Sequence, residues 1–137
     1  MNALDTSHSE KCLRTLDRAL MLYEAGGPDT EDAELFRSAC VKEFELLVEL
    51  AGKLLKKRLR PFFAANLEAD RLTYKDVFRH ATLHGLMPLD VAERWLNYRD
   101  VRNQTAHDYG ANYANQALAV MSTFAADARL VWQVLLA

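Results

Sequence analysis

Apolar residues recur every three or four positions along almost the whole chain, and this spacing is the feature that most constrains the fold. Such a step places side chains on one face of an α-helix, because the helix has about 3.6 residues per turn. The sequence lacks the strict alternation of apolar and polar residues that is typical of a half-buried β-strand. The chain is therefore predicted to be all-α, with one buried apolar face on each helix.

Glycine and proline residues divide this pattern into about five helical segments. They cover residues 9–24, 30–60, 74–84, 89–108 and 113–137. Residues 61–71 are predicted to form a turn or a broken helix, and Thr73 and Asp76 match a capping box at the start of the third segment. Short connections between amphipathic helices predict an antiparallel up-and-down helical bundle, with residues 1–137 in a single domain.

Composition restricts the function classes that fit this chain. Its 137 residues are half apolar, and the formal net charge of -2 excludes nucleic-acid binding by bulk positive charge, so any RNA contact must be local. Cys12 and Cys40 form no CxxC pair, so we expect neither a zinc site nor a disulfide, and a reduced, cytoplasmic setting. No apolar run approaches the roughly 20 residues that span a bilayer, so no membrane partner is expected.

The stretch RNQTAHDYG, residues 102–110, gathers several polar side chains near the end of the fourth predicted helix. At about 100° per residue, Arg102 and His107 lie about 140° apart around a straight helix. A single straight helix therefore cannot direct both side chains at one atom. Either the helix loosens before Gly110, its predicted end, or a second copy of the chain completes the site.

The spacing Arg102, His107 and Tyr109 resembles the R-x4-H-x-Y signature of HEPN domains of the HepT-like type, also known as nucleotidyltransferase substrate-binding proteins. Residues 75–87, KDVFRHATLHGLM, are similar to the segment before the motif helix in that family, and residues 44–53, FELLVELAGK, resemble its long second helix. One departure is Ala106, where many relatives have serine. The resemblance implies a small helical protein that forms a homodimer.

This resemblance also implies an activity, which is metal-independent RNA cleavage without a cofactor. The ribose 2′-hydroxyl attacks the adjacent phosphate, and His107 is the candidate base because an unperturbed histidine has a pKa of about 6.5. Arg102 would stabilise charge on the phosphate oxygens, since a guanidinium can donate two hydrogen bonds to them. Asn103 would orient His107 or a phosphate oxygen.

The resemblance also implies a partner, because members of this family act together with a minimal nucleotidyltransferase that serves as antitoxin. In HepT-like members this enzyme adenylylates the tyrosine of the motif, a position that Tyr109 matches. A bulky, negatively charged nucleotide two residues from His107 would keep an RNA phosphate out of the site.

Other polar groups have both functional and structural interpretations. The basic run that includes Lys56, Lys57, Arg58 and Arg60 either contacts RNA phosphates or is the solvated end of a long helix. His80 and His84 have the spacing of two metal ligands but no evident third ligand, which favours a position at the edge of the core.

Two further pairs of residues are better explained by structural roles than by functional ones. Glu45 and Glu49 lie one turn apart and invite an acid-base interpretation, but an ion pair from Glu49 to Lys53 at i, i+4 favours the structural one. Trp95 and Tyr98 fit core or dimer contacts better than base stacking.

Three function hypotheses follow from these residues. The first is a dimeric ribonuclease toxin that is silenced at Tyr109. The second is a non-catalytic subunit that presents substrate to a nucleotidyltransferase. The third is a helical scaffold whose polar cluster only caps a helix.

Overall fold

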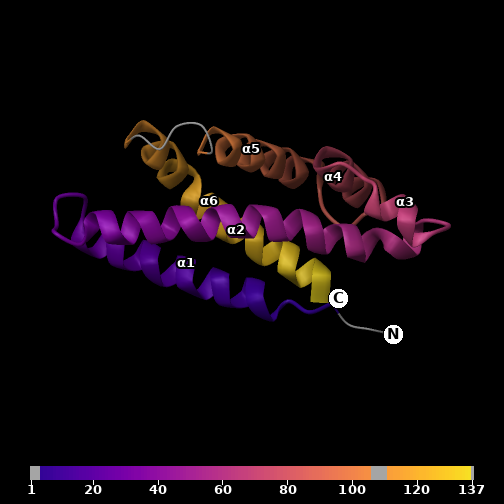
Figure 1. The fold of residues 1–137 in the computed structure, drawn as a ribbon, viewed down its shortest axis with the longest axis horizontal. Coiled ribbons are helices and arrows are strands. Elements are labelled where there is room, and N and C mark those ends of the chain that lie inside the picture. Colours follow the sequence, from indigo (N-terminus) through magenta and orange to yellow (C-terminus); the bar gives the residue numbers. More distant parts are fainter. Residues whose placement is uncertain (1–3, 106–110, 137) are drawn as a thin grey trace.

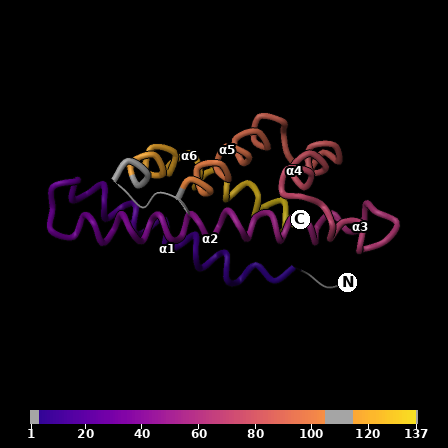
Figure 2. Tube along the Cα trace, turned by 45° about the horizontal axis from the view of Figure 1, so that its top comes forward, coloured from indigo at the N-terminus to yellow at the C-terminus, as the bar shows by residue number. Residues whose placement is uncertain are grey.

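One long helix, α2 (Ala33–Leu59), runs the length of the molecule, and the other long helices pack along it (Figure 1). This computed structural model describes residues 4–105 and 111–136, and the side chains of residues 4–104 and 115–136. Helix α1 (Ser7–Gly26) lies antiparallel to α2, and α6 (Ala111–Leu136) crosses α2 on another side. The end of α6 returns to the start of α1 (Figure 2), where the Trp132 indole donates a hydrogen bond to the Ser9 hydroxyl.

The remaining helices cover the side of α2 that α1 leaves open. Helix α4 (Tyr74–Leu83) packs on α2 and α5, while α5 (Leu89–Thr105) packs on α6 as well (Figures 1 and 2). The segment predicted to be a turn or a broken helix contains a 3-10 turn, η1 (Arg60–Phe62), and the short helix α3 (Asn66–Asp70). The described residues contain helices and no strand, so the predicted all-α bundle is confirmed.

Local capping explains where several helices begin and end. The Thr73 hydroxyl accepts a hydrogen bond from the Asp76 N–H at 3.2 Å, which is the hydroxyl half of the predicted capping box. At the other end of α4, Gly85 has a φ of +73°, and the Leu86 N–H donates to the Ala81 carbonyl at 2.8 Å. This is a Schellman ending, and its left-handed position suits glycine.

A cluster of aromatic rings forms the centre of the core. The Phe44 and Phe124 ring centroids lie 4.7 Å apart, and Tyr98 meets Phe124 edge-on at 5.0 Å. Trp95 is completely buried and stacks on Phe78 at 5.6 Å. Trp95 and Tyr98 are therefore core residues, as one of their two structural interpretations predicted.

A buried carboxylate fixes the register of α5 on α6. Asp127 on α6 is only 2% exposed and accepts two hydrogen bonds from Arg94, at 2.8 and 2.9 Å. The Tyr98 hydroxyl donates a third at 2.6 Å, and burial together with this bond raises the pKa of the Tyr98 phenol. Because Tyr98 lies one turn before Arg102, this network also positions the end of α5 that carries Arg102.

Residues Asn115–Leu136 of α6 are long and apolar enough, by length and composition, to cross a membrane. The expectation that no run approaches that length is therefore wrong for this segment. In the bundle, 44% of an 18-residue apolar window of this segment is buried, and the segment supplies Met121, Phe124 and Ala128 to the core. Packing in a bundle core accounts for such a composition without a membrane.

Candidate functional site at the end of α5

Arg102 and Asn103 lie in the last turns of α5, where α5 passes the middle of α2. The Arg102 Nη2 is 2.9 Å from the Glu49 Oε1 on α2. The Arg102 side chain is 31% exposed and that of Glu49 is 62% exposed, so solvent reaches this ion pair. Asn103 is exposed. A cation in the last turn of a helix also interacts favourably with the helix dipole.

Two carboxylates of α2 face this guanidinium. Glu45 lies one turn before Glu49, and burial raises its pKa, an effect that the positive charge of Arg102 partly offsets. The ion pairs of the described residues include Glu49–Arg102 but not the predicted Glu49–Lys53 pair. The prediction from i, i+4 spacing was wrong because a partner on another helix occupies the Glu49 carboxylate.

The other half of the predicted motif lies outside the described residues. The structure describes α5 as far as Thr105 and α6 from Ala111, and the predicted continuation of the helix to about Asp108 lies outside the described residues. His107, Tyr109 and Gly110 fall between those ends and are not described. The wheel angle between Arg102 and His107, and the roles of both residues, therefore stay predictions.

Both cysteines are buried free thiols. Burial raises the pKa of Cys12 and that of Cys40 to about 11, so both are protonated near neutral pH. A protonated, buried thiol is a poor nucleophile.

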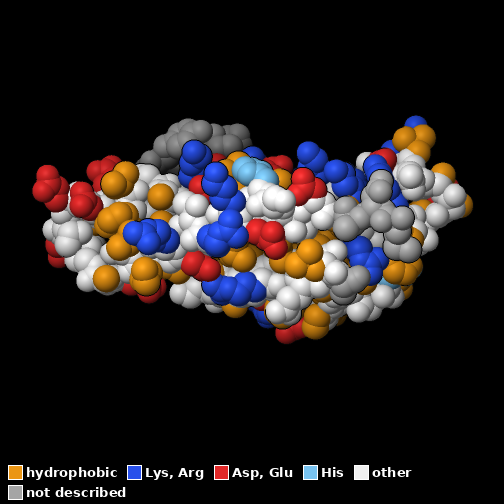
Figure 3. Space-filling view, turned by 90° about the horizontal axis from the view of Figure 1, so that it is seen from below, with side chains coloured by type: hydrophobic (Ala, Val, Ile, Leu, Met, Phe, Trp, Pro, Cys, Tyr) orange, Lys and Arg blue, Asp and Glu red, His pale blue; other side chains and the backbone are white. Residues whose placement is uncertain are grey.

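The basic residues at the end of α2 point in different directions. Arg60 donates two hydrogen bonds to Asp70, at 2.9 and 3.0 Å, and thereby joins the end of α2 to α3. Lys57 and Arg58 lie about 100° and 200° around the α2 axis from Lys56. Figure 3 shows one long face of the molecule, on which positive side chains are interspersed with negative, apolar and other side chains. An RNA contact by these four residues stays a prediction.

His80 on α4 and His84, directly after its end, lie at the edge of the core, as predicted. His84 stacks on Phe62 with ring centroids 4.1 Å apart, and His80 meets Phe63 at 5.1 Å. Among the residues that the structure describes, no group of three histidine, cysteine or acidic side chains is placed to hold a metal ion.

A polar pocket of about 280 Å³ opens between α2, α4 and α5, next to the Arg102–Glu49 pair. Its lining includes Glu49, Gly52, Lys53, Lys56, Tyr74 and Arg99. Sequence reasoning missed Tyr74 and Arg99 as parts of a site. Gly52 was the available signal, because a glycine inside a helical pattern often marks a close approach of another group.

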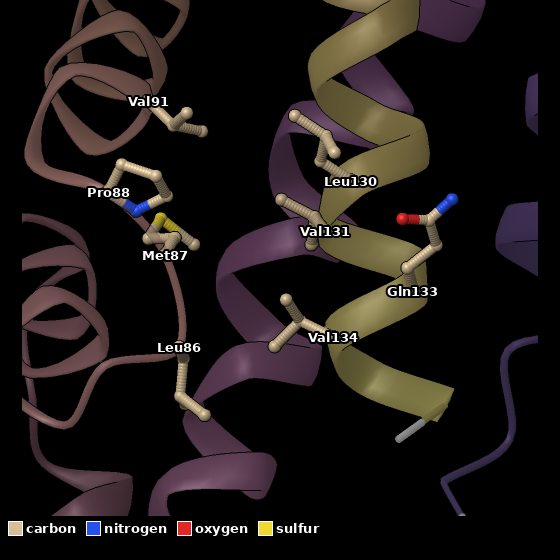
Figure 4. A pocket seen from close by; sticks show the side chains of 8 residues that line it. All are labelled: Leu86, Met87, Pro88, Val91, Leu130, Val131, Gln133 and Val134. Atoms are coloured by element: carbon tan, nitrogen blue, oxygen red, sulfur yellow. The ribbon is translucent and has the colours of Figure 1, made fainter.

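A second pocket, of about 330 Å³, is lined mainly by apolar residues. It lies between the α4–α5 connection and α6, where Leu86, Met87 and Val91 face Val131 and Val134 (Figure 4). None of its lining residues is charged. This pocket therefore offers no charged group that would bind a phosphate or transfer a proton.

The fold and this site define a class of protein: a small all-α bundle in which Arg102 lies at the end of α5, next to the polar pocket. The chain belongs to the family described as nucleotidyltransferase substrate binding protein like, whose model matches residues 4–135. The family assignment made from the motif is confirmed.

Individual relatives agree with this assignment. The chain is 29% identical over 87 residues to a Haemophilus influenzae protein named "Probable ribonuclease HepT". That alignment covers 64% of this chain and 58% of the relative.

Two solved structures share the fold. One is a Haemophilus influenzae protein described as having the fold of a substrate binding domain of a nucleotidyltransferase. Its TM-score is 0.81 at 20% identity, with 96% of this chain and 98% of that chain covered. The other, from Thermus thermophilus, has a TM-score of 0.71 at 27% identity and covers 93% and 98% of the two chains.

Proposed function

We propose that this protein is a ribonuclease toxin that cleaves RNA without a metal ion, with Arg102 and His107 as catalytic residues. His107 takes the proton of the ribose 2′-hydroxyl, and the 2′-oxygen forms a bond to the adjacent phosphorus. The bond from phosphorus to the 5′-oxygen breaks, and this oxygen takes up a proton as it leaves. The products are a 2′,3′-cyclic phosphate and a 5′-hydroxyl end.

The observation that carries this proposal is the setting of Arg102, the first residue of the motif. Its guanidinium is held 2.9 Å from Glu49, yet it keeps 31% of its side-chain surface open to solvent. A planar guanidinium held in this way is ready to donate two hydrogen bonds to a phosphate, which would take the place of the Glu49 carboxylate. The relative named "Probable ribonuclease HepT" supports the same activity.

A second copy of the chain completes the site in this proposal, because His107 would face Arg102 poorly along one straight helix. We expect the purified protein to have the mass of a homodimer in size-exclusion chromatography with light scattering. A monomer that cleaves RNA at an undiminished rate would remove this part of the proposal.

Substitution of His107 tests the catalytic assignment. The His107→Ala variant should lose both RNA cleavage and growth arrest on expression, while its far-UV circular dichroism stays that of the wild type. Equal toxicity of the variant and the wild type would overturn the assignment of His107 as the base.

The partner in this proposal is a cognate minimal nucleotidyltransferase that acts as antitoxin, and the family's description supports such a partner. Incubation with that enzyme and ATP should add adenylyl mass to Tyr109 and abolish cleavage. Mass spectrometry that finds the label on another residue, or on none, would contradict the proposed modification.

A non-catalytic substrate-binding subunit is the second candidate function. It is favoured by the fold shared with a protein described as a substrate binding domain. In that case the purified chain would bind a nucleotidyltransferase and leave RNA intact under every condition tried. The cleavage assay therefore separates the two candidates.

A further inference from the structure

The polar pocket between α2, α4 and α5 has an excess of positive charge. Lys53 and Lys56 of α2 and Arg99 of α5 line it, and Glu49 is the acidic residue in its lining. The Glu49 carboxylate pairs with Arg102 at 2.9 Å, so a neighbouring cation already offsets its charge. None of the ion pairs found among the described residues involves Lys53, Lys56 or Arg99.

The helical periodicity of α2 places the charged α2 residues of the pocket on one face of that helix. Glu49, Lys53 and Lys56 fall within about 60° around the helix axis. Lys56 also lies within electrostatic range of Asp70, but both oxygens of that carboxylate accept hydrogen bonds from Arg60. The ammonium groups of Lys53 and Lys56 are therefore the cations that this face of α2 offers to a ligand.

A fixed aromatic wall gives the pocket its shape. The Tyr74 ring lies so close to α2 that a Cβ on Gly52 would be 2.6 Å from the ring Cε2. The Tyr74 hydroxyl donates a hydrogen bond to the Val48 carbonyl at 3.1 Å, which ties the far end of the ring to α2. The Arg99 guanidinium, which also lines the pocket, stands 4.9 Å from the ring centroid in a cation–π position.

We propose that this pocket binds a phosphate group of a nucleotide, as a subsite next to Arg102. One guanidinium and two ammonium groups converge there, and guanidinium and ammonium groups are the side chains that proteins use for phosphate oxygens. A volume of about 280 Å³ is just below the roughly 300–1,000 Å³ of small-molecule sites, so it suits one nucleotide unit.

The source of the phosphate is the RNA strand if the proposed function holds, and that identification rests on it. Arg99 and Arg102 lie three residues apart on α5, about 4.5 Å along the axis, so one strand can contact both. A free nucleotide carries the same chemistry. The phosphate site itself needs only the pocket, whereas the RNA assignment also needs the ribonuclease.

Fluorescence anisotropy with a labelled 2′-O-methyl RNA oligonucleotide tests the pocket separately from catalysis, because this probe has no 2′-hydroxyl to attack. The Lys53→Ala/Lys56→Ala double variant should bind at least about tenfold more weakly than the wild type. The slope of log affinity against log salt should become shallower by about 0.7, since each phosphate that the protein neutralises on a single strand contributes about 0.7 and the pocket holds one. The matched control is Lys11→Ala/Lys42→Ala, which removes two exposed lysines outside the pocket and should keep the wild-type affinity for this probe.

Calorimetric titration with AMP and ATP provides the second arm of the test. Binding of the oligonucleotide that depends on Lys53 and Lys56 identifies a strand as the source, and binding of AMP or ATP with the same dependence identifies a free nucleotide. If neither probe distinguishes the pocket variant from its control, the proposal is overturned. If the pocket variant alone loses probe binding while unmodified RNA stays intact with the wild type, the pocket stands and the ribonuclease fails.

Discussion

Replacing Gly52 by alanine should destabilise the protein only while the Tyr74 ring is present. The new Cβ would lie 2.6 Å from the ring Cε2 and 2.7 Å from Cδ2, well inside the roughly 3.5–4.0 Å of a normal carbon contact. The ring cannot simply turn away, because its hydroxyl is bound to the Val48 carbonyl and Arg99 covers its face.

The size of the effect follows from three contributions. Alanine is favoured over glycine inside a helix by about 1 kcal/mol. Displacing a packed ring costs about 1–3 kcal/mol, and the loss of the hydrogen bond to Val48 costs about 1 kcal/mol more. The Gly52→Ala variant should therefore lose about 1–3 kcal/mol of unfolding free energy.

In a Tyr74→Leu background the sign should reverse, because leucine has no atom where the ring edge lies. There, Gly52→Ala should raise the unfolding free energy by about 1 kcal/mol. Urea unfolding of the four proteins, followed by far-UV circular dichroism, measures this double-mutant cycle. The reasoning is refuted if Gly52→Ala changes the unfolding free energy by the same amount in both backgrounds.

Three further predictions concern charged groups. The Asp127→Ala variant should lose about 1–3 kcal/mol of unfolding free energy in urea, because it leaves the buried Tyr98 hydroxyl without its acceptor, whereas Arg94 is 39% exposed and keeps Asp90 as a partner; a loss below about 0.5 kcal/mol would count against the network. Burial raises the pKa of Glu45, so the native state holds the proton of this carboxyl more tightly than the unfolded state does. The contribution of Glu45 to the unfolding free energy therefore falls as pH rises from 4.5 through the raised pKa. Glu45→Gln should flatten this slope in urea melts across that pH range, and an unchanged slope would contradict the assignment. Glu49→Gln should raise the affinity for non-cleavable RNA by up to about fivefold, because a phosphate then no longer competes with a carboxylate for Arg102. Fluorescence anisotropy measures this affinity, and the control Glu34→Gln, at the far end of α2, should produce no such gain.

Contacts within a single helix were largely predictable from the sequence. Apolar residues at helical spacing predicted one buried face on each helix, and Leu16, Phe44 and Phe124, which belong to that pattern, are completely buried. Thr73 was recognisable as a helix cap because its partner, Asp76, lies only three residues away. These features depend on helix periodicity and local hydrogen bonds, which follow from the order of the residues.

Contacts between helices were not predictable in this way. Glu49 and Arg102 are far apart in the chain, and only the packing of α5 on α2 brings them together. The same holds for Tyr74 and Gly52, whose close approach forms the wall of the polar pocket. Helix α3 was missed as a separate element because five residues are too few for a periodic pattern.

Cleavage of a labelled RNA in the presence of EDTA by the wild type, Arg102→Ala and Arg14→Ala tests the central claim most directly. Arg14 is an exposed arginine on α1, far along the chain from the site, and matches the change in charge. We predict metal-independent cleavage that Arg102→Ala slows by about 10²–10³-fold and Arg14→Ala leaves unchanged. Wild-type protein that leaves RNA intact, or Arg102→Ala protein that cleaves as fast as the wild type, would contradict the account.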